Sequence, residues 1–332
     1  MKPLETKKTE FHVTIDVVAL TILDGFLNVA VIQRDHRNSC IDMKRNGKVL
    51  EVPRDFDNHW ALPGGHVNSQ AENLIDAAER KIKEETSIEV NSENLVEIGA
   101  YGNLDRDPRS GRTVSIAFVT FQPMFATPSP GLHAKVAKFM PVLELLAEPN
   151  RLEFDHEEML IDAIQKVRDL MLSTPVATSF CPQDFTMTEL REVYEVLWHH
   201  AYDKEIDGRE RQKYAAEVRE YTVSDSYQLL SRASDLKYEF ALMPQAKLNK
   251  ITKILMSEAK NDSTRRPVIK NRLDPANFSR KVENIPGFIE KIPDSTPRSS
   301  LSNSTGRPAQ LFRRGKAERL DPPLRLRVKR GK

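Results

Sequence analysis

A glycine pair that leads into a charged helix is the feature that most constrains this chain. Residues 60–88 read WALPGGHVNSQAENLIDAAERKIKEETSI, with a helical pattern over residues 70–86. Within that pattern Glu84 and Glu85 follow Arg80 by about one helical turn, so their side chains are expected to lie near one another. The segment therefore predicts a strand, a turn and a helix that present several charges together.

The spacing in this segment resembles a Nudix box, whose pattern is G-x5-E-x7-R-E-U-x-E-E-x-G-U with U aliphatic. The matching positions are Gly65, Glu72, Arg80, Ile82, Glu84, Glu85 and Ile88. The loop from Gly65 to Glu72 is one residue longer than the pattern. Lys81 stands where a Glu is expected, and Ser87 stands where a Gly is expected. The box is therefore interpreted as inherited but degenerate.

Lys81 changes the chemistry that a Nudix box implies, because the missing Glu would be a metal ligand. Mg²⁺ takes oxygen ligands, and Lys has no acceptor atom to offer it. Hydrolysis is therefore expected to be lost or vestigial. No catalytic residue is assigned in the degenerate box of Glu72, Arg80, Lys81, Glu84 and Glu85. Glu84 and Glu85 are expected to hold a metal weakly or to form a solvated helix face, and no cofactor is required.

The charge of the chain is unevenly distributed. Residues 264–332 hold 18 Lys and Arg against 6 Asp and Glu, a net charge of +12. From totals of 50 and 48, this leaves 32 basic and 42 acidic residues before that segment, a net charge of −10. A basic end on an acidic body is typical of a nucleic-acid-binding region, and a merely soluble charged tail is the alternative.

Cysteine usage and hydropathy indicate a cytoplasmic protein. Cys40 and Cys181 are far apart and not in metal-ligand spacing, which suits a reducing compartment. No segment approaches the roughly 20 apolar residues of a membrane span. No membrane partner is therefore expected.

The first part of the chain predicts an α/β (α+β) sandwich over residues 1–173. A hairpin is expected at Asp24 and Gly25. The other expected elements are strands at 11–23, 26–34, 60–65, 95–101 and 114–121 and helices at 70–86 and 154–172. The expected buried stripes are Leu74, Ala77, Ala78 and Ile82 on the first helix and Leu160, Ile164, Val167 and Met171 on the second.

The second part predicts a winged helix-turn-helix domain formed by residues 174–200 and 273–315. Thr186 and Glu189 make a capping box before one helix, and Asp274 caps another. A basic strand at 309–313 would form the wing. Residues 201–272 are expected to be a helical insertion and residues 316–332 a basic tail.

Most of the chain resembles the Nudix-related transcriptional regulators, in which a Nudix-like domain is fused to a winged helix. The resemblance rests on WALPGGHV, YGNLDRDPRSGRTVSIAFVTF, FCPQDFTMTELREVYEVL, LDPANFSRKV and GRPAQLFRRG. The 72 residues of 201–272 depart from the family, which joins its two helices by a short turn. The resemblance implies a repressor of NAD or related nucleotide or sugar metabolism that acts as a homodimer on double-stranded DNA and senses ADP-ribose.

The resemblance also implies site residues. The expected ligand-binding residues are Arg34, Trp60, Gly64, Gly65, Tyr101, Asp105, Arg106 and Arg109. The expected DNA-binding residues are Asn277, Ser279, Arg280, Lys281, Arg307, Arg313 and Arg314. Trp60 is alternatively a core aromatic, and Arg106 and Arg109 alternatively belong to a salt-bridged loop. An active Nudix hydrolase of ADP-ribose or NADH-type substrates and a nucleotide-sensing adaptor remain alternative functions.

Overall fold

The computed structural model divides the chain into two compact units. It describes residues 11–34, 44–45, 48–49, 59–68, 72–104, 106–107, 112–131, 133–222, 273–293 and 310–326. The first unit takes in most of the described residues up to 166, and the second takes in the later residues together with 22–27 and 141–148.

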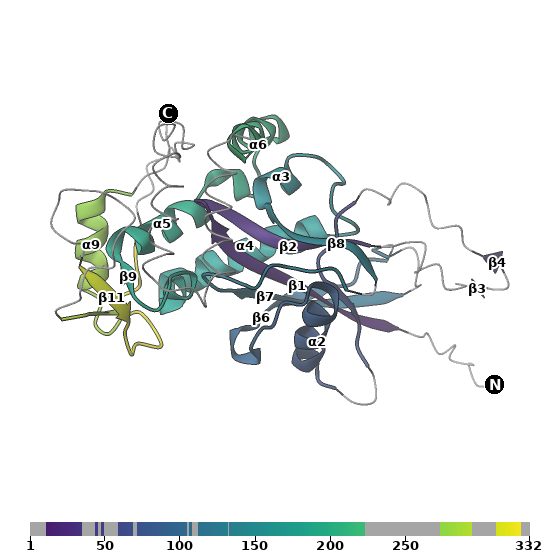
Figure 1. Cartoon of the computed structure of the whole chain (residues 1–332), viewed down its shortest axis with the longest axis horizontal. Helices are drawn as coiled ribbons and strands as arrows, with labels where there is room; N and C mark the ends of the chain where they lie inside the picture. Colours follow the sequence, from purple (N-terminus) through teal and green to yellow (C-terminus); the bar gives the residue numbers. More distant parts are fainter. Residues whose placement is uncertain are drawn as a thin grey trace, which may run out of the picture. The chain divides into compact units, whose positions relative to one another are not determined.

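A mixed six-stranded sheet forms the framework of the first unit (Figure 1). Its strands are β1 (His12–Leu23), β2 (Phe26–Arg34), β5 (Gly64–His66), β6 (Val96–Tyr101), β7 (Thr113–Phe121) and β8 (Ala134–Pro141). The order is β6-β7-β1-β2-β8, with β5 paired to β1. β1 runs parallel to β7 and antiparallel to β5. The α/β class expected from the sequence is confirmed.

The turn between β1 and β2 has the backbone that its sequence predicts. Asp24 and Gly25 have φ angles of 53° and 86°. Positive φ at both central residues is typical of the type I′ turn, whose twist matches that of the adjoining strands. Two shorter strands, β3 (Lys44–Arg45) and β4 (Lys48–Val49), pair with each other.

Helix α2 (Leu74–Thr86) covers one face of the sheet. Ala77, Ala78 and Ile82 are fully buried, as expected from the stripe. Leu74, however, is 40% exposed, so its expected place in the core is wrong. The expected helix start at Gln70, which lies outside the described residues, is also wrong, because Asn73 caps the helix and puts Leu74 in its first turn.

Side chains alternate between the two faces of β1, so its other face is turned away from α2. Helix α4 (His156–Ser173) meets that second face, where His156 approaches Asp16. Leu160, Ile164 and Val167 are fully buried, as is Met171, which confirms the stripe expected on this helix. The remaining short helical elements are η2 (Ser92–Asn94), α3 (Val142–Leu146), η3 (Pro175–Phe180) and η4 (His200–Tyr202).

Among its described residues, the second unit contains α5 (Met187–Leu197), α9 (Pro275–Glu283) and a small sheet in the order expected of a winged helix, with α6 (Gly208–Thr222) between the two helices. The strands are β9 (Phe185–Thr186), β10 (Ile289–Lys291) and β11 (Leu311–Arg314). The sheet order is β10-β11-β9. α5 and α9 meet where the Tyr194 and Phe278 rings pack edge to face with centroids 5.4 Å apart.

Both expected helix caps are present in this unit. Thr186 Oγ1 accepts from the Glu189 N–H at 3.2 Å, and the Glu189 carboxylate accepts from the Thr186 N–H at 2.6 Å. Asp274 accepts from the Asn277 N–H at 2.7 Å. The strand expected at 309–313 begins at Leu311 and ends at Arg314. Of the expected helical insertion, only 201–222 lies within the described residues.

The segment that follows β11 caps the end of α4. The Leu320 N–H donates to Ser173 O at 2.8 Å, and the Leu324 N–H donates to Leu172 O at 2.9 Å. Such carbonyls lack partners within a helix, so the returning chain satisfies them. The sequence predicted a basic tail over residues 316–332 but did not predict this packing. Residues 327–332 of the tail lie outside the described part of the chain. No helix among the described residues is long and apolar enough to cross a membrane.

We expect Thr186→Ala to destabilise the second unit by about 1 kcal/mol, because an N-terminal N–H of α5 loses its acceptor. Urea unfolding followed by tryptophan fluorescence measures this change, since Trp198 directly follows α5. Thr188→Ala is the matched control on the same helix, and its effect should stay within about 0.5 kcal/mol. Equal effects of the two substitutions would contradict a stabilising role for the cap.

Candidate functional site

Two glycines let β5 lie directly on β1 and so place the start of the candidate site. A Cβ on Gly64 would lie 2.3 Å from Asp16 Oδ1 and 2.3 Å from Ile15 O, so only glycine fits. Gly65 has a φ of +149°, and a Cβ there would lie 3.1 Å from Lys81 Cε. Their expected role in ligand binding stays a prediction, but both positions require the absence of a side chain.

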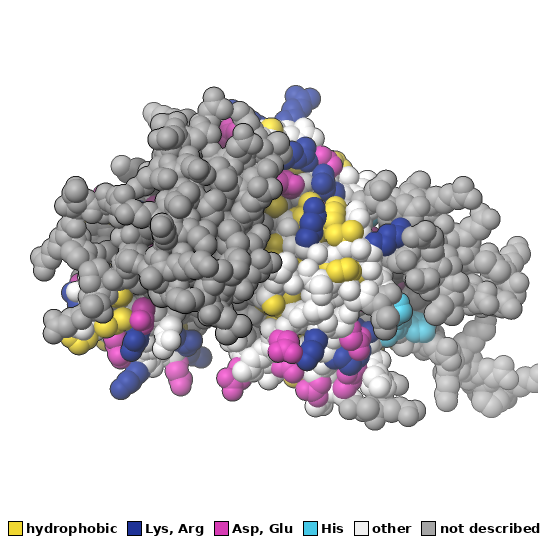
Figure 2. Space-filling view, in the orientation of Figure 1, with side chains coloured by type: hydrophobic (Ala, Val, Ile, Leu, Met, Phe, Trp, Pro, Cys, Tyr) yellow, Lys and Arg dark blue, Asp and Glu magenta, His cyan; other side chains and the backbone are white. Residues whose placement is uncertain are grey.

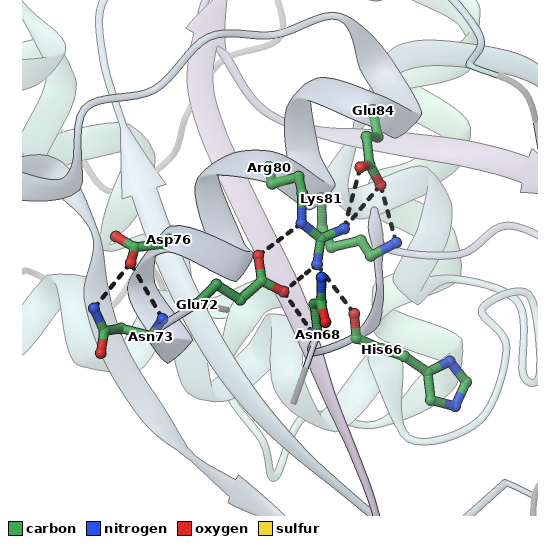
Figure 3. Close-up of polar contacts among 8 residues, drawn as sticks. All are labelled: His66, Asn68, Glu72, Asn73, Asp76, Arg80, Lys81 and Glu84. Carbon is green, nitrogen blue, oxygen red and sulfur yellow. Dashed lines mark hydrogen bonds and ion pairs between the residues drawn. The ribbon is translucent and has the colours of Figure 1, made fainter. Parts of the chain in front are cut away.

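Glu72 and Arg80 join the loop to the helix (Figure 3). Arg80 donates to both carboxylate oxygens of Glu72, through Nε at 2.7 Å and through Nη2. Arg80 Nη2 also donates to His66 O at 3.2 Å, and Glu72 accepts from the Asn68 N–H at 2.6 Å. The hydrogen bond from Arg80 is the main reason that the pKa of Glu72 is lowered to about 2.

The carboxylate of Glu84 is paired with two cations. Arg80 Nη1 donates to both of its oxygens at 3.1 Å, and Lys81 Nζ donates to Oε2 at 2.9 Å (Figure 3). Burial raises the pKa of Glu84, but the hydrogen bonds from Lys81 and Arg80 outweigh burial and lower it. Acidic and basic side chains are accordingly interspersed over the surface of α2 (Figure 2).

Glu85 differs from Glu84 although it is the next residue. It is buried, and burial raises the pKa of its carboxyl group despite the nearby charges of Arg34 and Lys81. The protonated form of Glu85 is therefore favoured relative to an ordinary glutamate. The two glutamates do not act as an equivalent pair of anions.

The box residues do not fit a magnesium ion. Both oxygens of Glu72 accept hydrogen bonds, and both oxygens of Glu84 face cations. The ammonium of Lys81 lies at the position where the family pattern has a carboxylate. In the described part of the chain, no three His, Cys, Asp or Glu side chains are grouped to hold a metal ion. Weak binding by Glu84 and Glu85 stays a prediction without support from this geometry.

Arg34 and Trp60 lie in packed surroundings in the first unit. Arg34 Nε is 3.4 Å from Glu153 Oε2, and its guanidinium lies 5.8 Å from the centroid of the Phe154 ring. Trp60 is 8% exposed, and Lys138 Nζ lies 4.6 Å from its ring centroid. This packing agrees with the alternative that Trp60 is a core aromatic, because stacking on adenine would require Lys138 to move.

Tyr101 and Arg106 are held by side chains of the chain itself. The Tyr101 hydroxyl donates to Asp162 Oδ2 at 3.0 Å. Arg106 is 8% exposed and donates to both oxygens of Asp155 at 2.8 and 2.6 Å. The geometry of Arg106 matches the salt-bridged alternative, so ligand contact would require this pair to open. The other two ligand candidates of this loop, Asp105 and Arg109, lie outside the described residues.

A buried polar cluster on the second face of the sheet was not anticipated from the sequence. Asp16 Oδ2 accepts from Ser115 Oγ at 2.5 Å, and Asp16 Oδ1 lies 3.5 Å from His156 Nε2. His156 Nδ1 accepts from the Leu62 N–H at 3.0 Å. Burial raises the pKa of Asp16, but His156, Ser115 and Arg106 together hold it well below its usual range. The available signal was a carboxylate inside the apolar run of β1.

The DNA candidates on α9 differ in how they are engaged. Arg280 is exposed, and its Nη2 donates to Asn277 Oδ1 at 3.1 Å. Ser279 Oγ donates to Pro275 O at 2.9 Å within the helix. Lys281 Nζ donates to the carbonyl of Arg325. Arg280 is thus the most accessible cation among these candidates.

The candidates of the expected wing lie on β11 and in the segment before it. Arg313 pairs with Asp184, and Arg314 is exposed at the end of the strand. Arg307 lies outside the described residues. The DNA-binding role of all three stays a prediction.

Comparison with known proteins finds a family match within the first half of the chain. Residues 27–163 match the family model described as NUDIX domain. The chain is 28% identical over 197 residues to the "ADPR responsive transcriptional repressor NtrR" of Acinetobacter baylyi, a match that covers 59% of this chain and 70% of that protein.

Two solved structures are also similar. One is a MutT/nudix family protein from Enterococcus faecalis, with 27% identity, coverage of 62% of this chain and 81% of that chain, and a TM-score of 0.45. The other is Shewanella oneidensis NrtR complexed with a 27mer DNA, with 23% identity, coverage of 62% and 83%, and a TM-score of 0.41. These TM-scores are too low to support a functional conclusion.

Residues 27–163 therefore form a Nudix domain, in which the box carboxylates of Glu72 and Glu84 are paired with cations. The match to the Acinetobacter repressor confirms the resemblance of the chain to the Nudix-related transcriptional regulators.

We expect Glu72→Gln to destabilise the protein at neutral pH and to lose this effect in acid. The pKa of Glu72 is depressed to about 2, so its stabilising charge is fully present above the ordinary value of 4.5 and is lost as the pH falls toward 2. The melting-temperature difference from wild type should narrow between about pH 6 and about pH 3. Glu79→Gln on the same helix is the control. A difference that does not vary with pH would argue against the ion pair.

Proposed function

We propose that this protein is a DNA-binding transcriptional regulator whose Nudix domain senses a nucleotide diphosphate and does not hydrolyse it. The observation that carries the proposal is the ammonium of Lys81, 2.9 Å from Glu84 in place of a metal ligand. A box neutralised in this way retains a cation for a diphosphate while lacking the ligand set that metal-assisted hydrolysis requires. ADP-ribose is the first ligand to test, since the Acinetobacter relative is described as ADPR responsive.

The second unit supplies the proposed DNA contact. Phe278 and Val282 bury one side of α9, which turns Arg280 toward solvent. An exposed, basic helix followed by a short sheet is suited to a helix in the major groove with a wing on the phosphate backbone. The net charge of +12 over residues 264–332 adds a sequence-independent attraction to DNA.

Regulation would follow from a difference in ligand affinity between two states of the protein. A ligand can release DNA only if it binds more tightly to the state that binds DNA poorly. We propose a homodimer on a palindromic operator as the unit in which these states differ. Repression of genes of NAD or related nucleotide or sugar metabolism is the proposed outcome.

Capture of genomic DNA by the purified protein at fixed salt, with and without ADP-ribose, tests the proposed function. We expect enrichment of a few palindromic sites that is lost when ADP-ribose is added. Sites that persist in ADP-ribose would support a DNA-binding regulator and would reject ADP-ribose as its effector. Absence of sequence enrichment would reject the regulator in favour of an adaptor, and release of AMP from ADP-ribose would favour the hydrolase.

We expect Arg280→Ala to weaken operator binding by about tenfold or more, because an exposed contact to a base or phosphate is lost. Fluorescence anisotropy with the captured operator measures this change. Lys83→Ala is the matched control, since Lys83 is an exposed cation on α2 that pairs with Glu89. Unchanged affinity in the Arg280 variant would remove α9 from the proposed DNA interface.

A further inference from the structure

We propose that Lys81 and Glu84 form an anion-exchange pair, in which Lys81 is the built-in counter-ion of the ligand's diphosphate and Glu84 is the internal anion that the diphosphate displaces. This inference rests on the proposed sensing of a nucleotide diphosphate. It goes further in giving a metal-free means of binding and a residue that sets the affinity.

Lys81 is held in place as a site residue would need to be. Its side chain is only 17% exposed and runs beneath Gly65, where a Cβ would lie 3.1 Å from Cε and 3.2 Å from Nζ. A residue larger than glycine at position 65 would therefore press on the lysine. The alkyl chain lies against the turn, and the ammonium is paired with Glu84 (Figure 3). A fixed cation loses less conformational freedom when an anion binds.

Glu84 is suited to leave this cation. Its side chain is 48% exposed, so the displaced carboxylate can be hydrated. Arg80 also donates to Glu84, and this second bond can hold the carboxylate after Lys81 has changed partner. Partly exposed ion pairs contribute little net stability, so the exchange of one anion for another costs little free energy.

Arg34 provides a second positive charge in the same region. The Glu85 carboxyl lies within electrostatic range of both Arg34 and Lys81. A diphosphate bound at Lys81 would thus lie in a region that holds a second cation, Arg34, which is itself paired with Glu153.

The anion-exchange pair and a metal site predict opposite effects of one substitution. If Glu84 competes with the ligand, removing its charge strengthens diphosphate binding. If Glu84 holds a metal that carries the diphosphate, removing its charge weakens binding and makes magnesium less effective. Glu84→Gln keeps the shape of the side chain and therefore separates the two cases.

Isothermal titration calorimetry of the full chain with ADP-ribose and with inorganic pyrophosphate, in magnesium and in EDTA at constant ionic strength, is the test. We expect equal wild-type affinity in both buffers. Glu84→Gln should bind about threefold more tightly or better, and Lys81→Met about tenfold more weakly. Glu89→Gln and Lys83→Met are the matched controls, because this exposed pair joins the last turn of α2 to the segment just after it. Both controls should bind as the wild type does.

A tenfold loss of affinity in EDTA, weaker binding by Glu84→Gln, or no binding of either ADP-ribose or inorganic pyrophosphate would each overturn the proposal. If Lys81→Met does not fold, as judged by circular dichroism, the wild-type titration in EDTA and the titration of Glu84→Gln still test the proposal. The calorimetry contains no DNA. A regulator with a different effector would therefore fail here and still bind its operator, which separates this inference from the proposed function.

Discussion

The geometry of the Nudix box depends on the hydrogen bonds that the Arg80 guanidinium donates. The guanidinium donates to Glu72, to Glu84 and to the backbone carbonyl of His66, and so joins the end of β5 and the following loop to α2. A planar guanidinium can serve several acceptors in fixed directions, which a lysine ammonium cannot. The position of Lys81 follows from this frame, because the next residue of the helix is then directed beneath Gly65.

The balance of charge in this frame separates recognition from chemistry. Glu72 and Glu84 accept hydrogen bonds from Arg80 and Lys81, so two carboxylates face two cations within a short stretch of chain. A metal-dependent hydrolase needs an excess of oxygen ligands at this place. The ion pairs of the box thus orient its side chains, while the ligand set for magnesium is not assembled.

Local sequence predicted the elements of this protein better than its tertiary contacts. The Asp24–Gly25 turn and the Thr186–Glu189 box could be predicted because each depends on neighbouring residues. The bond from Ser115 to Asp16 spans 99 positions, and that from Arg106 to Asp155 spans 49, so no local period reveals them. The misplacement of Leu74 has the same origin, since spacing alone does not locate the Asn73 cap.

The return of the chain to the end of α4 has a consequence for how the second unit is completed during synthesis. Ser173 and Leu172 receive their hydrogen bonds from Leu320 and Leu324, and Lys281 donates to Arg325. Domains generally fold as the chain leaves the ribosome. The carbonyl groups at the end of α4 therefore stay hydrated until about 150 further residues have been synthesised. The ammonium of Lys281 on α9 stays hydrated until about 40 further residues have been synthesised.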